Sequence, residues 1–411
     1  MRRVVVTGLG CVTPIGNDVN SFWDSLTRGR HGFGEITKFD ASKLKVKLCA
    51  EVKNFTPEIY IEKSEIRKTD LNAQYAIAAA AQAAEDSGIV GAVEPEMFGV
   101  YIGSGIGGIS TSTSQTEIML NKGADRISPF LVPMMISNMG SALVAIKFDV
   151  RGVNIPIVSA CATGTNAIGE AFRAIKHGYA DAILAGGAEA TINPLAVGGF
   201  ASAQALSTSA DADSASIPFD KRRDGFVMGE GAGVILLEEY EHAVKRGAKI
   251  YCEAVGYGAT CDAHHITAPN PEATEVARMI SLTFAEAGVR PDERLYINPH
   301  GTSTQLNDKT ETLAIKKALG DAAYKAAVSS TKSMTGHMLG AAGGAEAIAA
   351  VKTLETGIIP PTVGYKEPDP DCDLDYVPNA AREARVDTAL SISLAFGGHN
   401  AGVLFKRVGV Q

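Results

Sequence analysis

The chain has 411 residues, of which 45% are hydrophobic and 20% charged, as in a globular protein large enough for one or two domains. Its formal net charge of −8 argues against a nucleic-acid binder, because such a protein needs a basic excess to neutralise phosphates. Six cysteines without a CxxC pair or zinc-type spacing indicate reduced thiols in a cytoplasmic protein.

The N-terminal sequence MRRVVVTGLGC combines a charged start with a Gly-Cys pair, as a lipoprotein signal would. Its apolar segment, residues 4–6, is far shorter than the roughly 7–15 residues of a signal peptide's hydrophobic region, so we expect a β-strand here. No stretch of about 18 uninterrupted apolar residues occurs, and we therefore expect no membrane span.

Short β-branched runs alternate with helical patterns along the whole chain, which predicts a layered α/β fold. Strands are expected at residues 4–7, 99–103, 155–159, 182–186, 233–238, 250–256, 295–298, 327–330 and 389–394. Helices are expected at residues 71–87, 165–177, 271–287, 310–319 and 341–356. Before the third of these, Asn270 is expected to cap the helix and Pro271 to occupy its first position.

Two pairs of segments indicate a duplication. RRVVVTGLGCVT at the N-terminus is similar to KIYCEAVGYGAT near the midpoint, and VYIGSGIGG in the first half is similar to LYINPHGTS in the second. We therefore expect two related α/β halves, residues 1–250 and 251–411. Because no low-complexity linker separates them, the halves should pack against each other.

The stretch GSGIGG at residues 103–108 follows an apolar strand and satisfies the GxGxxG pattern of dinucleotide-binding loops. However, the next residues, ISTSTSQTEIML, make a poor helix start, and the acidic ribose partner could only be Asp125, which lies in a polar stretch. A tight loop that lets the backbone approach another segment is the favoured interpretation, with a nucleotide site as the alternative.

In IPIVSACATGT, residues 155–165, an apolar run ends in small residues around Cys161 and a helical pattern follows. A thiol at a helix N-terminus faces unpaired N–H groups and the positive end of the helix dipole, both of which favour the thiolate. The arrangement is similar to a nucleophile elbow, which presents a side chain at the end of a sheet. The alternative is a buried structural cysteine, the usual role of a free thiol.

Two histidines follow predicted strands, His300 in INPHGTST and His337 in SSTKSMTGHMLGAAGG. Strand ends are where α/β folds gather catalytic groups, although a lone loop histidine is usually a surface residue. Lys332 is interpreted either as a surface lysine or as a fixed cation balanced by an acid such as Glu346. The segment Phe396–Gly398 follows another strand end, and its glycines allow a tight turn with exposed amides.

Taken together, SACATGT, SIPFDKRRDGFVMGEGAG, NPHGTST, VSSTKSMTGHMLGAAGG and LAFGGHN resemble the β-ketoacyl-acyl-carrier-protein synthases, with similarity along essentially the whole chain. The match is best with the type II condensing enzymes of bacterial fatty-acid elongation. The resemblance implies a thiolase fold, with two duplicated α/β halves in a five-layered αβαβα core, a homodimer, and no metal or redox cofactor. It also implies the decarboxylative condensation of acyl- with malonyl-acyl carrier protein, which gives a β-ketoacyl product and carbon dioxide.

The resemblance assigns roles to individual residues. Cys161 would accept the acyl chain as a thioester, and His300 and His337 would hydrogen-bond the malonyl thioester carbonyl and stabilise the enolate. Lys332 and Glu346 would hold the histidines and the local charge.

The remaining implied positions concern substrate binding. Backbone N–H groups of Cys161 and Phe396 would form the oxyanion hole, and Phe396 would gate entry. The acyl, malonyl and pantetheine groups would be bound by Thr267, Thr302, Thr304, Ile106, Gly397 and Gly398. The basic docking patch for the acidic carrier protein would comprise Lys63, Arg67, Lys68 and Arg126, whose alternative interpretation is solvated surface charge.

The sequence departs from the family pattern beside His300, where Pro299 replaces a common Ala and Gln305 a common Pro. These changes leave the geometry of that loop and the chain-length preference open. Three rival functions are a polyketide-type condensing enzyme, a non-catalytic chain-length partner and a nicotinamide oxidoreductase. The presence of Cys161 with both histidines argues against the second, and the third rests on the glycine pattern alone.

Overall fold

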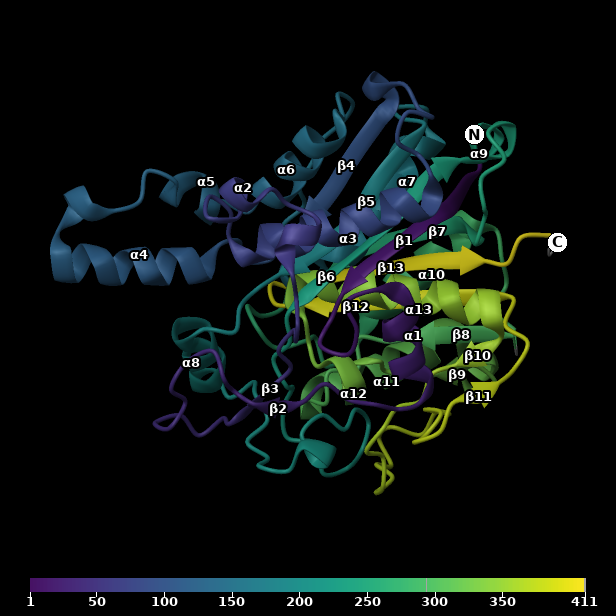
Figure 1. Cartoon of the computed structure of the whole chain (residues 1–411). Coiled ribbons are helices and arrows are strands. Elements are labelled where there is room, and N and C mark those ends of the chain that lie inside the picture. The colour runs from purple at the N-terminus through teal and green to yellow at the C-terminus, as the bar shows by residue number, and fades with distance from the viewer. Residues whose placement is uncertain (293, 410–411) are drawn as a thin grey trace.

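The computed structural model describes residues 1–292 and 294–409 (Figure 1). Its strands are β1 (Val4–Val12), β2 (Gly34–Glu35), β3 (Leu48–Cys49), β4 (Phe98–Gly103), β5 (Ala182–Glu189), β6 (Gly231–Glu239), β7 (Cys252–Cys261), β8 (Leu295–Asn298), β9 (Ala327–Val328), β10 (Ile358–Ile359), β11 (Arg382–Glu383), β12 (Thr388–Ala395) and β13 (His399–Lys406). Its helices are α1 (Val19–Thr27), α2 (Lys63–Ile66), α3 (Leu71–Ser87), α4 (Ile109–Lys122), α5 (Leu131–Met135), α6 (Met139–Phe148), α7 (Thr163–Lys176), α8 (Pro194–Ser202), α9 (Tyr240–Lys245), α10 (Thr274–Ala287), α11 (Gln305–Leu319), α12 (Lys332–Thr335) and α13 (Ala342–Thr356).

The main sheet of the described residues has the strand order β4-β5-β6-β1-β7-β13-β12-β8-β9. Outward from the centre, β1, β6, β5 and β4 correspond to β7, β13, β12 and β8. The directions repeat as well, since β4 and β5 are parallel like β8 and β12, and the pairings β5–β6 and β6–β1 are antiparallel like β12–β13 and β13–β7. This repeat confirms the duplication, whereas the boundary at residue 250 stays a prediction.

The two halves of the sheet join through a short β1–β7 contact, in which Val4, Val5 and Val6 pair with Ala254, Glu253 and Cys252. Helix α3 packs on the outer face of the first half, α10 on the outer face of the second, and α7 and α13 lie between the two (Figure 1). The resulting five layers are those that the family resemblance implied.

Small residues allow the layers to approach closely. The added Cβ of an alanine at Gly10 of β1 would lie 2.0 Å from the carbonyl oxygen of Ala79 on α3. In the middle layer, a Cβ at Gly164 of α7 would lie 2.8 Å from the backbone nitrogen of Gly344 on α13. The high glycine content therefore reflects layer packing as well as turns.

Several predicted elements differ from the structure. Residues 155–159 do not form a regular strand, and Ile155 and Val158 are 47% and 56% exposed. Only an isolated bridge between Val100 and Asn154 marks the sheet edge that β9 occupies in the other half. An apolar run does not by itself make a strand when its neighbour on one side is missing.

Helix boundaries were also displaced. The predicted cap Asn270 is wrong, because its side chain accepts the N–H of Glu272 in a turn and α10 begins only at Thr274. Helix α11 begins at Gln305, five residues earlier than predicted, and strand β13 was not predicted at all. The stretch after GSGIGG does form a helix, α4, in which the hydroxyls of Ser112 and Thr113 bond carbonyls one turn back.

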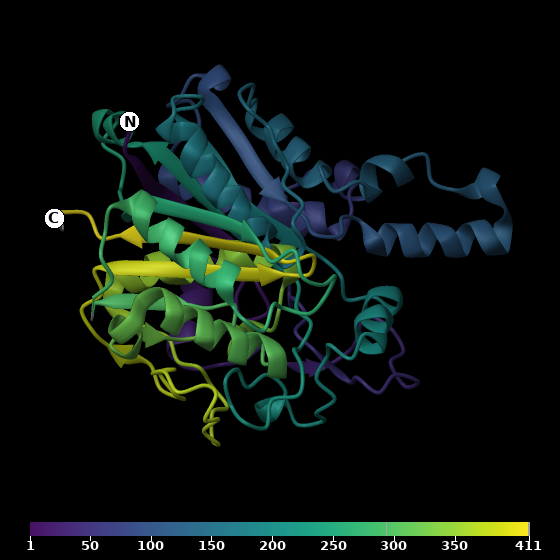
Figure 2. The same ribbon diagram turned by 180° about the vertical axis from the view of Figure 1, so that it is seen from behind.

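Helices α4 and α5 form an arm that projects from the body of the molecule (Figures 1 and 2). Among the described residues, none of the helices combines the length and apolarity that crossing a membrane requires.

Candidate active site

One cavity of about 360 Å³ collects side chains from both halves of the chain. Of the residues singled out from the sequence, its lining includes Cys161, His300, His337, Thr267, Thr302, Thr304, Phe396 and Gly398. These residues come from five separate loops or turns at the ends of strands and helices. The fold therefore brings together a thiol, two imidazoles and several hydroxyls that are far apart in sequence.

Cys161 lies in a turn of 3-10 helix, Ala160–Ala162, directly before α7. The preceding residue, Ala160, has φ +49°, a left-handed conformation that costs a non-glycine residue energy and often marks a functional turn. The N–H of Ser159 donates to the hydroxyl of Thr163, 2.9 Å away, and ties the turn to the first residue of the helix. The thiol is held at the helix start, as the sequence predicted, although no strand precedes it.

Burial opposes the thiolate that the helix start was expected to favour at Cys161. Burial raises the pKa of Cys161 to about 12, because the cavity removes the water that would solvate a sulfur anion. Lys332 lowers this pKa, whereas Glu189 and Glu346 raise it. The thiol is therefore neutral at physiological pH and must lose its proton as it reacts.

The two histidine rings lie edge to face, with centroids 5.1 Å apart and an interplanar angle of 86°. Nδ1 of His337 accepts the N–H of Leu339 at 3.3 Å, so in the neutral ring the hydrogen resides on Nε2. Burial and the nearby Lys332 hold the pKa of His300 and of His337 well below the usual range. Both rings are neutral and each can donate one N–H.

Lys332 and Glu346 form a buried ion pair behind the cavity, with side chains only 2% and 3% exposed. Lys332 begins α12 and Glu346 lies on α13, so the pair connects the strand end that precedes His337 to the central helix layer. Neither side chain belongs to the cavity lining. The pair therefore acts on the site through charge and through the position of α12.

A series of aromatic rings connects the predicted gate to the histidines. Phe396 lies 6.2 Å from Phe200, Phe200 lies 5.7 Å from Phe226, and Phe226 lies 5.1 Å from His337, all measured between ring centroids. Phe396 begins the tight turn between β12 and β13, in which Gly397 has φ +86°. Over the described residues, the backbone N–H groups of Cys161 and Phe396 donate to no partner outside their own turns.

Two buried glutamates near the site were missed by the sequence analysis. Glu311 on α11 accepts the N–H groups of His300 and Gly301, at 2.6 and 2.8 Å. Glu189, the last residue of β5, accepts the N–H groups of Gly105 and Ile106, at 2.9 and 3.3 Å. The similarity of VYIGSGIGG to LYINPHGTS aligns Gly105 with His300 and relates the two loops, but it does not point to either glutamate.

The interpretation of GSGIGG as a nucleotide site is wrong. The amides of Gly105 and Ile106, which would have to hold a pyrophosphate, are used by Glu189, and that of Gly107 donates to the hydroxyl of Ser104 at 2.9 Å. A Cβ at Gly108 would lie 2.0 Å from the carbonyl oxygen of Met134. The loop is the close backbone approach that the sequence favoured.

Other predicted residues lie outside the cavity lining. Ile106 and Gly397 are not part of it, although Gly397 lies between the lining residues Phe396 and Gly398. Of the predicted docking patch, Lys63 belongs to α2, and Arg67 and Lys68 directly follow it, with Lys68 paired to Glu65 at 2.7 Å. The turn between α4 and α5, which contains Arg126, lies at the far tip of the arm (Figures 1 and 2).

Comparison with known proteins agrees with these features. Residues 1–243 match the family described as "Beta-ketoacyl synthase, N-terminal domain" and residues 251–366 the corresponding C-terminal domain. A relative from Synechocystis sp. named 3-oxoacyl-[acyl-carrier-protein] synthase 2 is 52% identical over 99% of this chain and 98% of its own length. A relative of the same name from Coxiella burnetii is 49% identical over 99% of both chains.

Similar solved structures also cover the whole chain. A β-ketoacyl synthase from Burkholderia phymatum has a TM-score of 0.91 and 34% identity, and covers 99% of this chain and 100% of its own. The ketosynthase of a type II polyketide synthase, solved in complex with its acyl-carrier protein, has a TM-score of 0.90 and 34% identity, with 99% of both chains covered. The ishigamide ketosynthase/chain length factor has a TM-score of 0.93 and 37% identity, covering 99% of this chain and 100% of its own.

Proposed function

This chain belongs to the β-ketoacyl synthase family, and we propose that it condenses an acyl group with a malonyl unit, both carried as thioesters on acyl carrier protein, through an acyl intermediate on Cys161. The observation that carries the proposal is the shared cavity of Cys161, His300 and His337. The products are a β-ketoacyl-acyl carrier protein and carbon dioxide, as in fatty-acid elongation.

In the first half-reaction, the sulfur of Cys161 attacks the acyl thioester, and the pantetheine thiol leaves with the proton that Cys161 loses. One thioester replaces another, so the exchange is nearly isoenergetic. Burial raises the pKa of Cys161, and its proton therefore has to pass to the leaving pantetheine sulfur as the attack proceeds.

In the second half-reaction, the malonyl group loses carbon dioxide and leaves a negative charge on its thioester oxygen. Nε2–H of His337 and one N–H of His300 are the proposed donors to that oxygen. Both rings are neutral, since burial and Lys332 lower their pKa values, and so each donates without neutralising the enolate. The enolate carbon then attacks the acyl carbonyl, and Cys161 departs as a thiolate that takes up a proton from water, because its own proton left with the pantetheine thiol.

The backbone supplies the proposed oxyanion hole. Residues Cys161 and Phe396 border the cavity, and their N–H groups have no competing acceptor outside their turns over the described residues. Preorganised donors of this kind stabilise a tetrahedral oxyanion without reorganisation during the reaction. Phe396, packed against Phe200, is the proposed gate because it borders the cavity where the turn between β12 and β13 begins.

Fatty-acid elongation is favoured over polyketide synthesis by the relatives. Those named 3-oxoacyl-[acyl-carrier-protein] synthase 2 are 47–52% identical to this chain, whereas the polyketide ketosynthase is 34% identical. A non-catalytic chain-length partner is disfavoured, because Cys161 and both histidines are present in one cavity.

We further propose that acyl carrier protein docks at Lys63, Arg67 and Lys68, with Arg126 of the arm as an additional contact, and that the protein acts in the cytoplasm.

A second copy of the chain is the proposed cover for apolar side chains on the arm and beside it, namely Leu120, Val132, Ile155 and Val158, which are 47–77% exposed. Sedimentation of the purified protein tests the homodimer, and a monomer at micromolar concentration contradicts it.

Intact mass spectrometry after mixing with long-chain acyl carrier protein tests the proposed function. One acyl adduct is expected on the wild type and none on Cys161→Ala. Cys261→Ala is the matched control, because Cys261 is exposed and not part of the cavity lining, and it should retain the adduct. Addition of malonyl-acyl carrier protein should discharge the adduct as a β-ketoacyl product, and an unmodified wild type contradicts the mechanism.

A further inference from the structure

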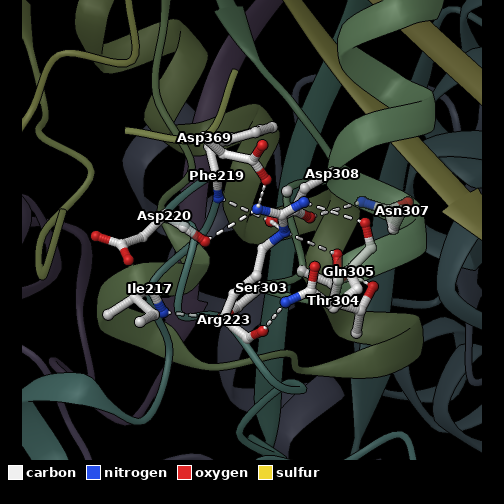
Figure 3. Close-up of polar contacts among 12 residues, drawn as sticks. Ile217, Phe219, Asp220, Arg223, Ser303, Thr304, Gln305, Asn307, Asp308 and Asp369 are labelled. Atoms are coloured by element: carbon white, nitrogen blue, oxygen red, sulfur yellow. Dashed lines mark hydrogen bonds and ion pairs between the residues drawn. The ribbon is translucent and has the colours of Figure 1, made fainter. Parts of the chain in front are cut away.

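The loop between β8 and α11, which carries His300, Thr302 and Thr304, is held on its outer side by one buried arginine. Arg223 is 2% exposed, and its guanidinium lies at the centre of the polar cluster in Figure 3. Its Nε donates to the carbonyl oxygen of Thr304 at 3.3 Å and its Nη2 to that of Gln305 at 3.1 Å. These are the residues at which the loop ends and α11 begins.

Further contacts anchor the guanidinium itself. Its Nη1 donates to the carbonyl oxygen of Asp220 at 2.9 Å and to the carboxylate of Asp369 at 2.6 Å. Its Nε lies 3.5 Å from the carboxylate of Asp308, in the first turn of α11. Arg223 therefore joins three segments, and its planar fork of donors is suited to several acceptors at once.

A second hydrogen bond joins Gln305 and Arg223 in the reverse direction. The side-chain amide of Gln305 donates to the carbonyl oxygen of Arg223, so the two residues bond each other reciprocally. Where relatives have proline at this position, that return bond cannot form. Pro would otherwise fit, because Gln305 is the first residue of α11 and its backbone N–H has no partner within the helix.

The two segments joined by Arg223 both contain strained backbone. Phe219 has φ +65° and Ser303 has φ +69°, left-handed values that non-glycine residues adopt only when neighbours enforce them. The enforcing contacts are the bond from the N–H of Ile217 to the hydroxyl of Ser303, at 2.9 Å, and that from the N–H of Phe219 to Asp308, at 2.8 Å.

We infer that Arg223 is a positioning residue for the second half-reaction, because it fixes the loop of His300, Thr302 and Thr304 and makes no contact with the Cys161 turn. The inference rests on the proposed function. Arg223 touches neither the cavity nor a reacting atom, and it acts through the backbone of residues 304 and 305. Gln305 strengthens the same connection from the loop side.

The inference is tested by measuring acylation of Cys161 and malonyl condensation separately in the variant Arg223→Lys. In Arg223→Lys, a single ammonium cannot serve the four acceptors, and the loop is expected to move. Displacement of catalytic groups by about 1 Å can cost about 10²-fold in rate, so we expect malonyl decarboxylation and condensation to slow by roughly 10- to 100-fold. Acylation of Cys161, measured by intact mass, should stay within about two-fold of the wild type.

Hydrogen–deuterium exchange supplies a readout that does not depend on activity. Peptides covering residues 299–306 should exchange faster in Arg223→Lys, while those covering 157–165 should not change. Arg222→Lys is the matched control, because Arg222 pairs with Asp220 and the carbonyl oxygen of Gly364 and does not contact the loop. It should resemble the wild type in both assays.

Two milder variants test the same inference if Arg223→Lys does not fold. Gln305→Pro and Asp369→Asn each remove one bond, and each should slow condensation about two- to five-fold with acylation unchanged. Equal loss of both half-reactions in the variants, or no loss in any, overturns the inference. A wild type that is never acylated overturns the proposed function first, and that outcome is visible before any variant is compared.

Discussion

The loops after β4 and β8 occupy equivalent places in the two halves. Both are held by a buried glutamate, but they have different roles. In each, two successive backbone N–H groups donate to a buried glutamate: Gly105 and Ile106 to Glu189, His300 and Gly301 to Glu311. One loop packs against Ala160 of the cysteine turn, and the other presents an imidazole to the cavity.

The difference lies in the direction from which each glutamate arrives. Glu189 comes from the neighbouring strand β5, and a Cβ at Gly105 would lie 2.8 Å from its carboxylate and 3.3 Å from the carbonyl oxygen of Ala160. Glu311 reaches its amides from α11, which follows the loop, and the side-chain direction at His300 stays open to the cavity. The duplicated fold thus offers two similar strand ends, and packing leaves room for a catalytic side chain at one of them.

The largest effect is expected from removing that side chain. His300→Ala should leave acylation of Cys161 intact and slow condensation by roughly 10²–10³-fold, because one donor to the developing enolate is lost. His337→Ala should show the same pattern. Rates of carbon dioxide release from malonyl-acyl carrier protein measure the step, and equal loss of acylation would contradict the division of roles between the loops.

Adding a side chain at Gly105, the position equivalent to His300, tests why the loop after β4 has a glycine there. Gly105→Ala places a Cβ against Glu189 and should lower the free energy of unfolding by about 1–3 kcal/mol, as overpacked sites do. Gly198→Ala on α8 is the control, since no atom lies within 4 Å of its added Cβ. Urea unfolding measures both, and a Gly105→Ala protein as stable as the control would show that the carboxylate can move aside.

Neutral replacements of the anchors should assign each glutamate to its own half-reaction. A glutamine offers one acceptor oxygen where two N–H groups donate, so Glu311→Gln should shift the His300 loop and slow condensation about 10-fold. Glu189→Gln should instead slow acylation, because that loop packs against Ala160, which directly precedes Cys161. Single-turnover assays of the two steps measure both variants, and slower acylation in Glu311→Gln with slower condensation in Glu189→Gln would contradict this assignment.

The smallest effect concerns pH. Burial raises the pKa of Glu311 to about 7 from 4.5, so between these values the folded protein holds a proton that the unfolded chain releases. The free energy of unfolding contributed by this group is therefore fully present below about pH 4.5 and falls as pH rises towards 7. Relative to Glu311→Gln, the wild type should lose on the order of 1 kcal/mol between about pH 5 and pH 8 in urea titrations. Parallel curves would contradict the raised pKa.

Local patterns predicted well where the physics is local. The helices at Leu71–Ser87 and Ala342–Thr356 followed from an alanine-rich pattern ending at glycine, and the observed ends agree within one residue. The prediction of a strand at residues 155–159 was wrong, because strand formation depends on pairing with a neighbouring strand as well as on β-branched residues. The cap at Asn270 failed because the side chain bonds Glu272 in a turn of its own.

Ordered motifs and strand–helix alternation are properties of the chain, and they were enough to identify the family, the layered α/β class, the duplication and the candidate catalytic residues Cys161, His300 and His337. The electrostatic state of these groups and the contacts that hold them follow from tertiary packing. The neutral thiol of Cys161, the neutral histidines, the anchors Glu189 and Glu311 and the contacts of Arg223 all depend on burial and on tertiary contacts, such as that of Arg223 with Asp369, 146 positions away. Burial and long-range contacts exist only once the layers have packed, which is why no local pattern revealed them.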